Sequence, residues 1–391
     1  MAKVGKSLIL LTHEYPPYVF GGVAYYSQQL AKWLADRGWK VYVIAGRAGR
    51  KERATVHQWG NIVEVRIYFP DIPPRWVFFV KFAERFVGML LQKGIRLVLS
   101  NSPLTGFLHI LENVKITTVY HGTSYALLPF FKTMDALKSA KPGEIPLYFS
   151  YPVLRSWIRR DLIRSDFNIF VARHVRLEAE SLYPELAPKI RQFGAVAYPG
   201  IDCRLLCDIK RYEPRRKRMK LVIAFVGRLY YNKGVTYALE TVENLIKKGE
   251  KDVELWVFGT GPLQRWVAMK SKQLPIRYFG FVERSKLLSL LAHYVDVLLH
   301  PSLYEAAPMA LVEAQALGIP TITFDLPWAH EFVINGVNGY RAPYPDVERL
   351  GEMVLKATEL DPGKVALSAK RFDRETAFRV VESILEKMGY G

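Results

Sequence analysis

Two glutamates, Glu305 and Glu313, lie on either side of an expected helix start in the segment HPSLYEAAPMALVEAQALGIP, residues 300–320. Pro308 suits the first helical position, where a missing N–H costs nothing, and a helix start is a ready anion site. The unpaired amides at this start belong to Met309, Ala310 and Leu311. Glu313 lies roughly 6 Å further along the axis, at about 1.5 Å per residue. The segment therefore offers a carboxylate, a phosphate cradle and a second carboxylate, the order in which a nucleotide sugar presents hydroxyls, diphosphate and ribose.

The residues on either side of the helix start indicate an α/β unit. The helix dipole favours acidic residues near any helix N-terminus, so the two glutamates alone leave a purely structural role open. However, Val295–His300 (VDVLLH) and Ile319–Phe324 (IPTITF) both have the composition of short buried strands. A strand, a polar loop, a helix start and a second strand form an α/β unit, in which ligands lie at the carboxyl ends of the strands.

A second set of charged residues follows another expected strand, in VGRLYYNKG, residues 226–234. Gly227 allows the backbone to turn tightly where the strand ends. Arg228 and Lys233 then lie in the loop before a helix. Two cations at the carboxyl end of a strand suit a diphosphate, Arg by its planar fork and Lys as a point charge. The alternative is that both are solvated loop charges.

Three residues in the first half of the chain are candidates for ligand contact. Gly21 and Gly22 precede the first expected helix, where a backbone without side chains lets a ligand approach the helix N-terminus. They do not have the G-x-G-x-x-G spacing of a dinucleotide fingerprint. His121 directly follows the expected strand Lys115–Tyr120. A plain loop turn and a structural histidine are the alternatives.

Two glycines and two apolar residues in the second half are candidates for contact with a base or ribose. Gly259 and Gly261 follow the expected strand Val253–Phe258, where they would let a ligand come close to the backbone. Phe281 and Val282 follow a later strand and are suited to flank a base. Core packing is the alternative for both apolar residues.

The elements expected around these residues form two series of strand, loop and helix. An amphipathic helix over Val23–Arg37 belongs to the first series, and a basic, proline-bearing run at Arg211–Arg218 marks the boundary. We therefore expect an α/β fold with two Rossmann-like domains facing a central cleft, over residues 1–208 and 209–371. The main expected strands are Lys6–Leu11, Val41–Ala45, Arg96–Ser100, Lys115–Tyr120, Phe167–Val171, Leu221–Val226, Val253–Phe258, Ile276–Phe279, Val295–Leu299 and Thr321–Phe324.

The composition narrows the classes of partner. A formal net charge of +18 on 391 residues favours an anionic partner or surface. No zinc-finger, RNA-binding or helix-turn-helix signature accompanies the charge, so no nucleic-acid partner is expected. No segment approaches about 18 uninterrupted apolar residues, and the first apolar run is too short for a signal peptide, so a cytoplasmic protein is expected. Cys203 and Cys207 are expected to be ordinary thiols, and neither a metal-ligand cluster nor an Asp-x-Asp motif is evident.

Together these motifs resemble those of the retaining glycosyltransferases of family 4 (glycosyl transferases group 1), which have the GT-B fold. PSLYEAAPMALVEAQALGIPTI is similar to the E-x7-E signature of that family, although Ala306–Met309 replaces the glycine-rich run of many members. The resemblance covers most of the chain and is weakest from Pro73 to Asp166. The other matching segments, in the family's order, are GGVAYYSQQLAKWLADRGWKV, YHG, YPGID, FVGRLYYNKG, VFGTGP, FGFV and FDLPWAHEFVINGVNGY.

The resemblance implies a metal-independent, retaining hexosyltransferase that uses a nucleotide-diphosphate sugar and no further cofactor. Arg228 and Lys233 would stabilise the leaving diphosphate, Glu305 and His121 would contact the donor sugar, and Glu313 would bind the ribose. A last helix over residues 372–391 would pack back on the first domain. The implied catalytic residues are His121, Arg228, Lys233 and Glu305, and the implied donor-binding residues are Gly21, Gly22, Gly227, Gly259, Gly261, Val282, Pro308, Met309, Ala310, Leu311 and Glu313.

The acceptor is less constrained by the sequence. Pro73–Ile95 has aromatic residues on one side of an expected helix and basic residues on another, a pattern found in helices of membrane interfaces and in helices packed on a core. With the aromatic and basic stretch Leu127–Arg164, it favours a lipid-linked or membrane-proximal acceptor and a peripheral position on the inner face of an anionic membrane.

The alternatives to such a glycosyltransferase are a nucleotide-sugar epimerase or glucan synthase of the same fold, and a non-catalytic protein that binds sugar or nucleic acid. Base, sugar, linkage and oligomeric state stay open.

Overall fold

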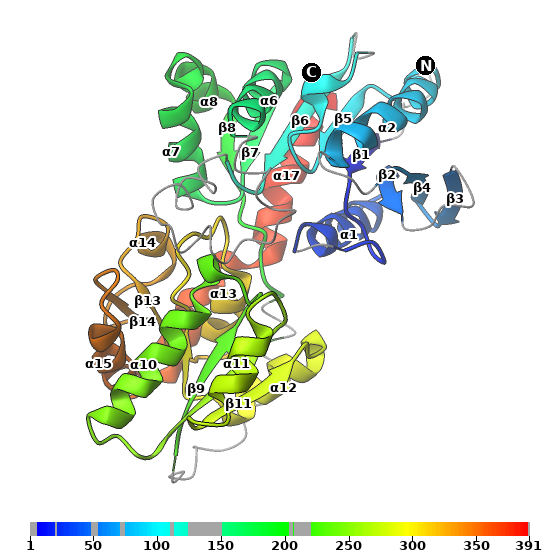
Figure 1. Cartoon of the computed structure of the whole chain (residues 1–391). Helices are drawn as coiled ribbons and strands as arrows, with labels where there is room; N and C mark the ends of the chain where they lie inside the picture. Colours follow the sequence, from blue (N-terminus) through cyan, green and yellow to red (C-terminus); the bar gives the residue numbers. More distant parts are fainter. Residues whose placement is uncertain are drawn as a thin grey trace. The chain divides into compact units, whose positions relative to one another are not determined.

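The computed structural model describes residues 6–19, 22–47, 54–70, 75–109, 113–123, 151–202, 206 and 220–389. These residues form two compact units, one from positions up to 199 together with 376–389, and one from positions 200–375. In each unit, helices cover a mainly parallel sheet, which confirms the prediction of two Rossmann-like domains (Figure 1). Several sequence predictions lie outside the described residues: those on Gly21, Cys203, Cys207, Arg211–Arg218 and most of Leu127–Arg164.

The sheet of the first unit has eight strands, and all neighbours except β3 and β4 are parallel. Its central strand β1 is a continuous apolar run because both faces of a parallel sheet are covered, and its residues Leu8 to Leu11 are fully buried. In spatial order the strands are β3 (Ala54–Trp59), β4 (Ile62–Tyr68), β2 (Lys40–Arg47), β1 (Ser7–Thr12), β5 (Leu97–Ser100), β6 (Lys115–Tyr120), β7 (Phe167–Phe170) and β8 (Gly194–Val196).

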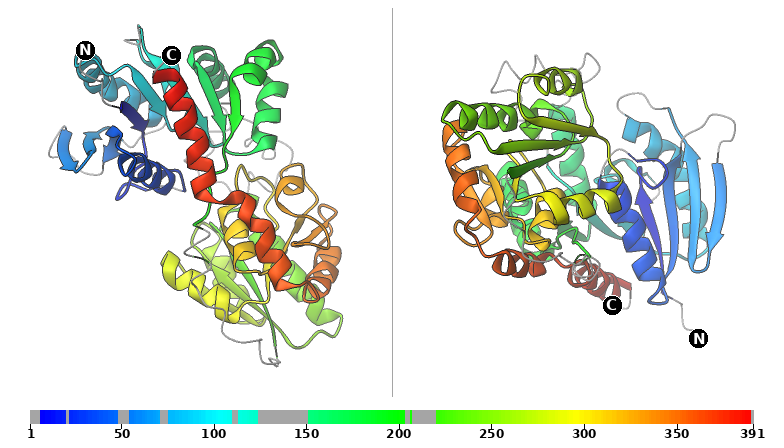
Figure 2. Two further views of the ribbon diagram at one scale, coloured as in Figure 1. Left: turned by 180° about the vertical axis from the view of Figure 1, so that it is seen from behind. Right: turned by 90° about the horizontal axis from the view of Figure 1, so that it is seen from below.

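The helices of the first unit include the last helix of the chain, α17 (Arg374–Gly389), drawn red in Figure 2. It packs on this unit through the Phe378 ring, which lies edge-on to Tyr26 at 5.5 Å, and through Glu382, which accepts a hydrogen bond from Trp39 Nε1 at 3.0 Å. The other helices described here are α1 (Gly22–Ala35), α2 (Arg75–Gln92), the 3₁₀ helix η1 (Thr105–Phe107), α6 (Tyr151–Arg164), α7 (Arg173–Leu182), η3 (Pro184–Leu186) and α8 (Ala187–Phe193).

The sequence left open whether the apolar side of α2 packs on the protein core or faces a membrane, and in the structure this side is buried. Phe79 and Ala83 are fully buried in a core cluster, and Trp76 packs edge-on against Trp157 of α6 at 6.2 Å. The apolar side of this helix therefore belongs to the protein core. What α2 presents to solvent is a narrow stripe, with Phe82 about half exposed. Among the described residues, no helix is both long and apolar enough to cross a membrane.

The sheet of the second unit is fully parallel, in the order β11-β10-β9-β12-β13-β14. The strands are β9 (Leu221–Val226), β10 (Val253–Phe258), β11 (Ile276–Gly280), β12 (Val297–Leu299), β13 (Thr321–Phe324) and β14 (Gly339–Ala342). The helices are η4 (Tyr231–Lys233), α10 (Val235–Lys247), α11 (Gln264–Lys270), α12 (Arg284–Tyr294), α13 (Met309–Ala316), α14 (Ala329–Phe332), α15 (Val347–Ala357), α16 (Pro362–Ser368) and η5 (Ala369–Phe372).

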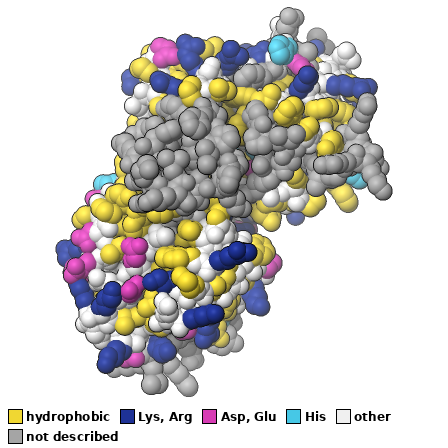
Figure 3. Space-filling model, in the orientation of Figure 1, with side chains coloured by type: hydrophobic (Ala, Val, Ile, Leu, Met, Phe, Trp, Pro, Cys, Tyr) yellow, Lys and Arg dark blue, Asp and Glu magenta, His cyan; other side chains and the backbone are white. Residues whose placement is uncertain are grey.

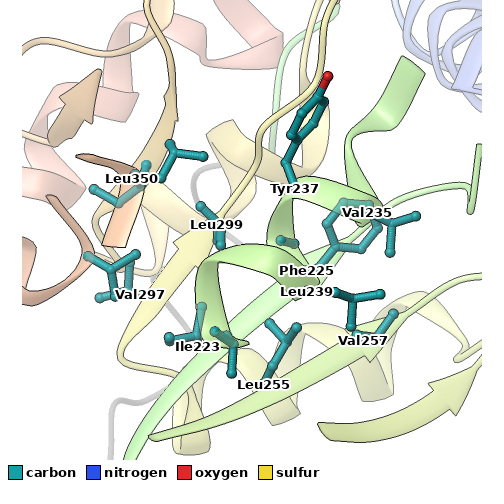
Figure 4. Close-up of a cluster of buried hydrophobic side chains, with 14 of the residues drawn as sticks. Ile223, Phe225, Val235, Tyr237, Leu239, Leu255, Val257, Val297, Leu299 and Leu350 are labelled. Carbon is teal, nitrogen blue, oxygen red and sulfur yellow. The ribbon is translucent and has the colours of Figure 1, made fainter. Parts of the chain in front are cut away.

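Apolar side chains, mostly aliphatic, from the strands and the helices form the core of this unit (Figure 4). Ile223 of β9 and Val297 of β12 face side chains of α10 and α15, among them Leu239 and Leu350. All four side chains are almost completely buried. This packing holds β9 and β12 side by side, and the candidate site lies at their carboxyl ends.

The antiparallel hairpin β3–β4 is the largest element that the sequence analysis missed. Its strands alternate polar and apolar residues, ATVHQW and IVEVRIY, and the turn is Gly60-Asn61 with Gly60 at φ +54°. Alternation around a two-residue turn of glycine and asparagine is a strong hairpin signal. The short strands β8 and β14 were also missed, because three or four residues carry too little periodicity.

Candidate functional site

The candidate site lies at β9, on either side of which the chain adds the other strands of the second sheet. From β9 the chain first builds β10 and β11 on one side, then β12, β13 and β14 on the other. Ile223 pairs with Val297 and Ala224 with Leu298, so the loops that leave β9 and β12 are neighbours. Ligands of open parallel sheets bind at such a switch point, outside the carboxyl ends of the strands.

Hydrogen bonds and one close approach of the backbone hold these two loops together. The Leu303 N–H donates to the Asn232 carbonyl at 2.8 Å, and the Ser302 hydroxyl donates to the same oxygen at 3.2 Å. Gly234 adopts φ +76°, and a Cβ at this position would lie 2.0 Å from the Pro301 carbonyl oxygen. Glycine is therefore required here by conformation and by close approach. These contacts fix the loop that carries Lys233 against the loop that carries Glu305.

Lys233, Glu305 and His300 form a charged cluster at this point. Lys233 Nζ donates to Glu305 Oε1 at 2.7 Å, and His300 Nε2 lies 3.0 Å from the same oxygen. Burial raises the pKa of Glu305, but the Lys233 charge and the His300 hydrogen bond outweigh it and hold that pKa well below its usual range. The carboxylate is therefore ionised, accepts from both neighbours, and requires the proton of His300 to be on Nε2.

His300 is a site residue that the sequence analysis did not assign. It is almost fully buried, and its Nδ1 has no hydrogen-bond partner among the described residues. The sequence could have indicated this role by the position of His300, which lies directly after the strand β12 and five residues before Glu305. A histidine at this position can hold a buried carboxylate ionised even when the lysine binds something else.

Arg228 shares the β9 loop with Lys233, as predicted, but its environment is different. It is exposed, and its guanidinium lies over the Tyr230 ring at 5.2 Å. A cation over an aromatic face is held loosely at an exposed position. The loop therefore offers one fixed cation, Lys233, and one adjustable cation, Arg228, at the carboxyl end of the same strand.

Glu313 is paired with an arginine that the sequence analysis also missed. The Arg284 Nε and Nη2 groups donate to Glu313 Oε1 at 3.0 and 2.5 Å. Burial raises the pKa of Glu313, and the Arg284 charge partly opposes this. Both donors use one carboxylate oxygen, so they leave Oε2 for another donor. Arg284 opens α12 three residues after the exposed Phe281, in the loop already singled out for base contact.

The start of helix α13 differs in detail from the prediction. Pro308 occupies the N-cap position, with φ −80° and ψ 77°, so the helix begins at Met309 and has no side-chain cap. The Met309 N–H donates to the Ala307 carbonyl at 3.0 Å. Of the three predicted amides, Ala310 and Leu311 therefore lie in the open first turn, where a helix lacks internal acceptors.

The remaining predicted positions fall at loop starts in both units. A Cβ on Gly259 would lie 1.9 Å from the Gly227 carbonyl oxygen, and one on Gly261 would lie 2.6 Å from the Leu229 carbonyl oxygen. Both glycines therefore have a packing role, whatever else they contact. Val282 lies half-buried after β11. In the first unit Gly22 opens α1, and a Cβ there would meet none of the described residues within 4 Å.

His121 lies at the carboxyl end of β6 in the first unit, as predicted. Its Nε2 is 2.8 Å from Asn101 Oδ1, and the Tyr26 ring lies edge-on to it at 4.9 Å. Burial lowers the pKa of His121 to about 4, Glu14 opposes the change and His13 adds to it. His121 is therefore neutral at physiological pH. Asn101, fully buried directly after β5, was not singled out in the sequence.

No group of three or more His, Cys, Asp or Glu side chains in the described part of the chain is arranged to hold a metal ion.

The two units present different chemical groups at the carboxyl ends of their sheets. The second unit offers cations, paired carboxylates and open helix amides, which suit a diphosphate and hydroxyl groups. The first unit offers a neutral histidine and a buried amide.

Comparison with known proteins agrees with this chemistry. The family model of glycosyl transferases group 1 matches residues 208–374, and that of glycosyltransferase family 4 matches residues 20–205. The chain is 25% identical over 381 residues to a glycogen synthase of Mycobacterium tuberculosis, which covers 93% of this chain and 88% of that protein. It is 24% identical over 387 residues to the phosphatidylinositol N-acetylglucosaminyltransferase GPI3 subunit of Saccharomyces cerevisiae, covering 94% and 78%.

A solved structure shows the same fold. A sucrose-phosphate synthase from Thermosynechococcus elongatus matches with a TM-score of 0.70 and 17% identity, covering 98% of this chain and 97% of that one. The two family matches adjoin and together span nearly all of the sequence. The chain belongs to the group 1, family 4 glycosyltransferases of the GT-B fold, and it is a hexosyltransferase that takes its sugar from a nucleotide sugar.

Proposed function

We propose that the enzyme transfers its sugar with retention and without a metal, and that the carboxyl edge of the second sheet binds the donor. In this proposal Lys233 and Arg228 bind the diphosphate, with the open amides of α13. Glu305 accepts hydrogen bonds from hydroxyls of the sugar, and Glu313 accepts from the ribose. The observation that carries the proposal is the cluster of Lys233, Glu305 and His300 at the switch point.

The cluster explains how one site can accept both a diphosphate and a sugar. Without donor, Lys233 neutralises Glu305. When a diphosphate arrives, it offers Lys233 a stronger counter-charge, while His300 still donates to Glu305 and keeps it ionised. As the bond between the sugar and the phosphate breaks, the two cations stabilise the growing charge on the leaving diphosphate. The acceptor oxygen then bonds to the anomeric carbon on the face from which the diphosphate departs, and the hydroxyl proton passes to the departing diphosphate oxygen, which gives retention.

The test is a panel of nucleotide sugars scored by released nucleoside diphosphate, with the anomeric configuration of the product determined by NMR. We expect release from at least one donor, unchanged by a strong chelator, and a product of the same configuration as the donor. An inverted product would overturn retention. Binding of donors without any release would support a non-catalytic sugar-binding protein instead.

The glycogen synthase among the relatives favours one second candidate, a glucan synthase. Such an enzyme extends a glucan chain. Product analysis with and without a glucan primer separates it from transfer to another acceptor, and the appearance of an isomerised nucleotide sugar without acceptor would indicate an epimerase.

We further propose a lipid-linked acceptor and a peripheral, cytoplasmic position at an anionic membrane. The support is a stripe on α2 that is exposed and mixes basic with apolar residues: Lys81, Phe82, Arg85 and Met89, followed by Lys93. Lys and Arg side chains also alternate with hydrophobic ones over the described surface near α2 and α6 (Figure 3). A relative named for its action on phosphatidylinositol is consistent with this acceptor class.

This second proposal is tested by co-sedimentation with liposomes. Each basic side chain near an anionic surface contributes about 1 kcal/mol, so the three in the stripe together should give detectable binding that weakens with salt. We expect a variant with Lys81, Arg85 and Lys93 changed to Gln to lose binding. A control with Lys247, Lys248 and Lys251 changed to Gln, all exposed on the second unit, should bind as wild type does. Equal binding by all three proteins would contradict the assignment.

A further inference from the structure

Three buried polar atoms in the second unit have no hydrogen-bond partner in the part of the chain that the structure describes. They are His300 Nδ1, Thr323 Oγ1 and Trp328 Nε1. All three side chains are buried, and they belong to the carboxyl ends of the neighbouring strands β12 and β13 or to the loop that follows β13. A buried polar group without a partner is costly and rare in native proteins. Three of them near one another therefore indicate a group that binds between them.

The pairing of β12 with β13 places two of these side chains next to each other. Leu299 pairs with Ile322, and the His300 N–H continues the ladder by donating to the Ile322 carbonyl at 2.7 Å. The Leu299 and Ile322 side chains both belong to the core cluster on one face of the sheet. Side chains alternate along a strand, so His300 and Thr323 are neighbours on the opposite face.

Trp328 completes the group from the loop after β13. Its ring lies edge-on to the His300 ring, with 6.0 Å between the centroids. The indole N–H can only donate, and with the histidine proton on Nε2, toward Glu305, Nδ1 of the neutral ring can only accept. A cation would meet the indole N–H, and an anion would meet the lone pair of Nδ1. A water molecule suits the set, because it accepts from Trp328 and donates to His300 and to the Thr323 hydroxyl.

We infer that a buried water molecule joins Trp328, Thr323 and His300, and that Trp328 is through it a positioning residue that keeps the His300 proton on Nε2. The water site rests on the contacts above, whereas its part in the reaction rests on the proposed function. When Lys233 turns to the diphosphate, the Nε2–H group stays directed at Glu305, because the water occupies the other ring nitrogen. Without this water, the proton can move to Nδ1, which leaves a lone pair of His300 facing the carboxylate.

The direct test combines a crystal structure that resolves ordered water with ¹⁵N NMR of protein labelled at histidine. We expect one water molecule within about 2.7–3.2 Å of both Trp328 Nε1 and His300 Nδ1. The NMR spectrum, in which His300 is assigned by the signals lost in His300→Gln, should show a protonated Nε2 and an unprotonated Nδ1. A protonated Nδ1, or the absence of water between the two nitrogens, would overturn the inference.

The pH dependence of turnover tests the consequence for the reaction. At saturating donor it reports the ionisation of groups in the donor-bound enzyme. Lys233 and His300 are the two side chains that lower the pKa of Glu305. Trp328→Phe keeps an aromatic ring but removes the N–H group, so the carboxylate should gain its proton at a higher pH. We expect the acid limb of the profile to move up by about one pH unit, the size of one hydrogen bond to a charged group.

Trp256→Phe is the matched control. Trp256 lies on β10, packs against Phe279 and Tyr294, and also has a buried indole N–H without a partner among the described residues. This variant should leave the acid limb where it is in wild type. A Trp328→Phe enzyme that is slower at every pH, with its acid limb unmoved, would show a general packing role and contradict the inference. If wild type turns over no nucleotide sugar, the proposed function fails, while the crystal structure and the NMR spectrum still decide the water site.

Discussion

The carboxyl edges of the two sheets share a topology and differ in charge. At the edge of the second sheet, Lys233 and Arg284 each pair with a buried glutamate, and Arg228 is exposed nearby. At the edge of the first sheet, Asn101 and a neutral His121 end a chain of hydroxyl and amide groups. Charged pairs can exchange partners with an anion, whereas a neutral chain can only orient hydroxyl groups. The charged edge therefore suits phosphate groups, and the neutral edge suits hydroxyl groups.

Loss of the fixed cation should have the largest effect. Lys233→Ala removes a positive charge from the leaving diphosphate and leaves Glu305 with His300 alone, so we expect turnover to fall well over tenfold. Arg228→Ala should also lower turnover more than tenfold, but less than Lys233→Ala, because Arg228 is exposed. Steady-state rates at saturating donor measure both effects. Lys247→Ala, an exposed lysine of α10, is the control and should be near wild type.

Acid should destabilise the first unit through His121. The pKa of His121 is lowered to about 4 in the folded protein, so the unfolded chain binds more protons between that pH and the unperturbed value near 6.5. Stability is therefore full above about pH 6.5 and falls as the pH drops toward 4. Relative to His121→Asn, wild type should lose up to about 3 kcal/mol of unfolding free energy over this window. Urea unfolding at a series of pH values measures the difference, and a constant difference would argue against a His121 that stays neutral in the folded protein.

Loss of Arg284 should weaken the binding of the ribose through its effect on Glu313. Arg284→Gln removes the charge that opposes the effect of burial, so the pKa of Glu313 should rise further and its carboxylate should accept hydrogen bonds less well. We expect nucleoside diphosphate affinity to fall about fivefold to tenfold, a loss of roughly 1–1.4 kcal/mol. The preference for ribose over dideoxyribose should shrink as well. Arg277→Gln on β11, an exposed arginine paired with Glu254, is the matched control. An unchanged ribose preference would remove Glu313 from the ribose site.

Removal of divalent metal should have no effect. In the proposed site Arg228 and Lys233 supply the positive charge at the diphosphate, so activity should survive a strong chelator. The assay is nucleoside diphosphate release before and after chelation. Activity lost on chelation and restored by magnesium or manganese would show that the charged edge is incomplete without a metal.

The sequence predicted the repeating elements better than the contacts between them. Strands β9, β10 and β13 begin and end where they were predicted, because buried parallel strands are rich in apolar and β-branched residues. Arg284 and Asn101 carried no motif, and each finds its partner on a different element, 29 positions away for Glu313 and 74 for Ser27. Such pairs depend on the register and crossing of elements, which local patterns do not contain. Gly259 and Gly261 were singled out by their pattern for contact with a ligand, which stays a prediction, and the structure gives both a packing role.

The division of labour between the two edges is tested most directly by calorimetric titration of two ligands, a nucleoside diphosphate and the corresponding nucleotide sugar, into wild type, Lys233→Ala and His121→Phe. We predict that Lys233→Ala weakens both ligands by a similar factor, because both carry the diphosphate. His121→Phe should weaken the nucleotide sugar alone, because the family resemblance implies that His121 contacts the donor sugar, which only that ligand carries. The account would be contradicted if Lys233→Ala bound both ligands as wild type does, or if His121→Phe weakened the bare nucleoside diphosphate as much as the nucleotide sugar.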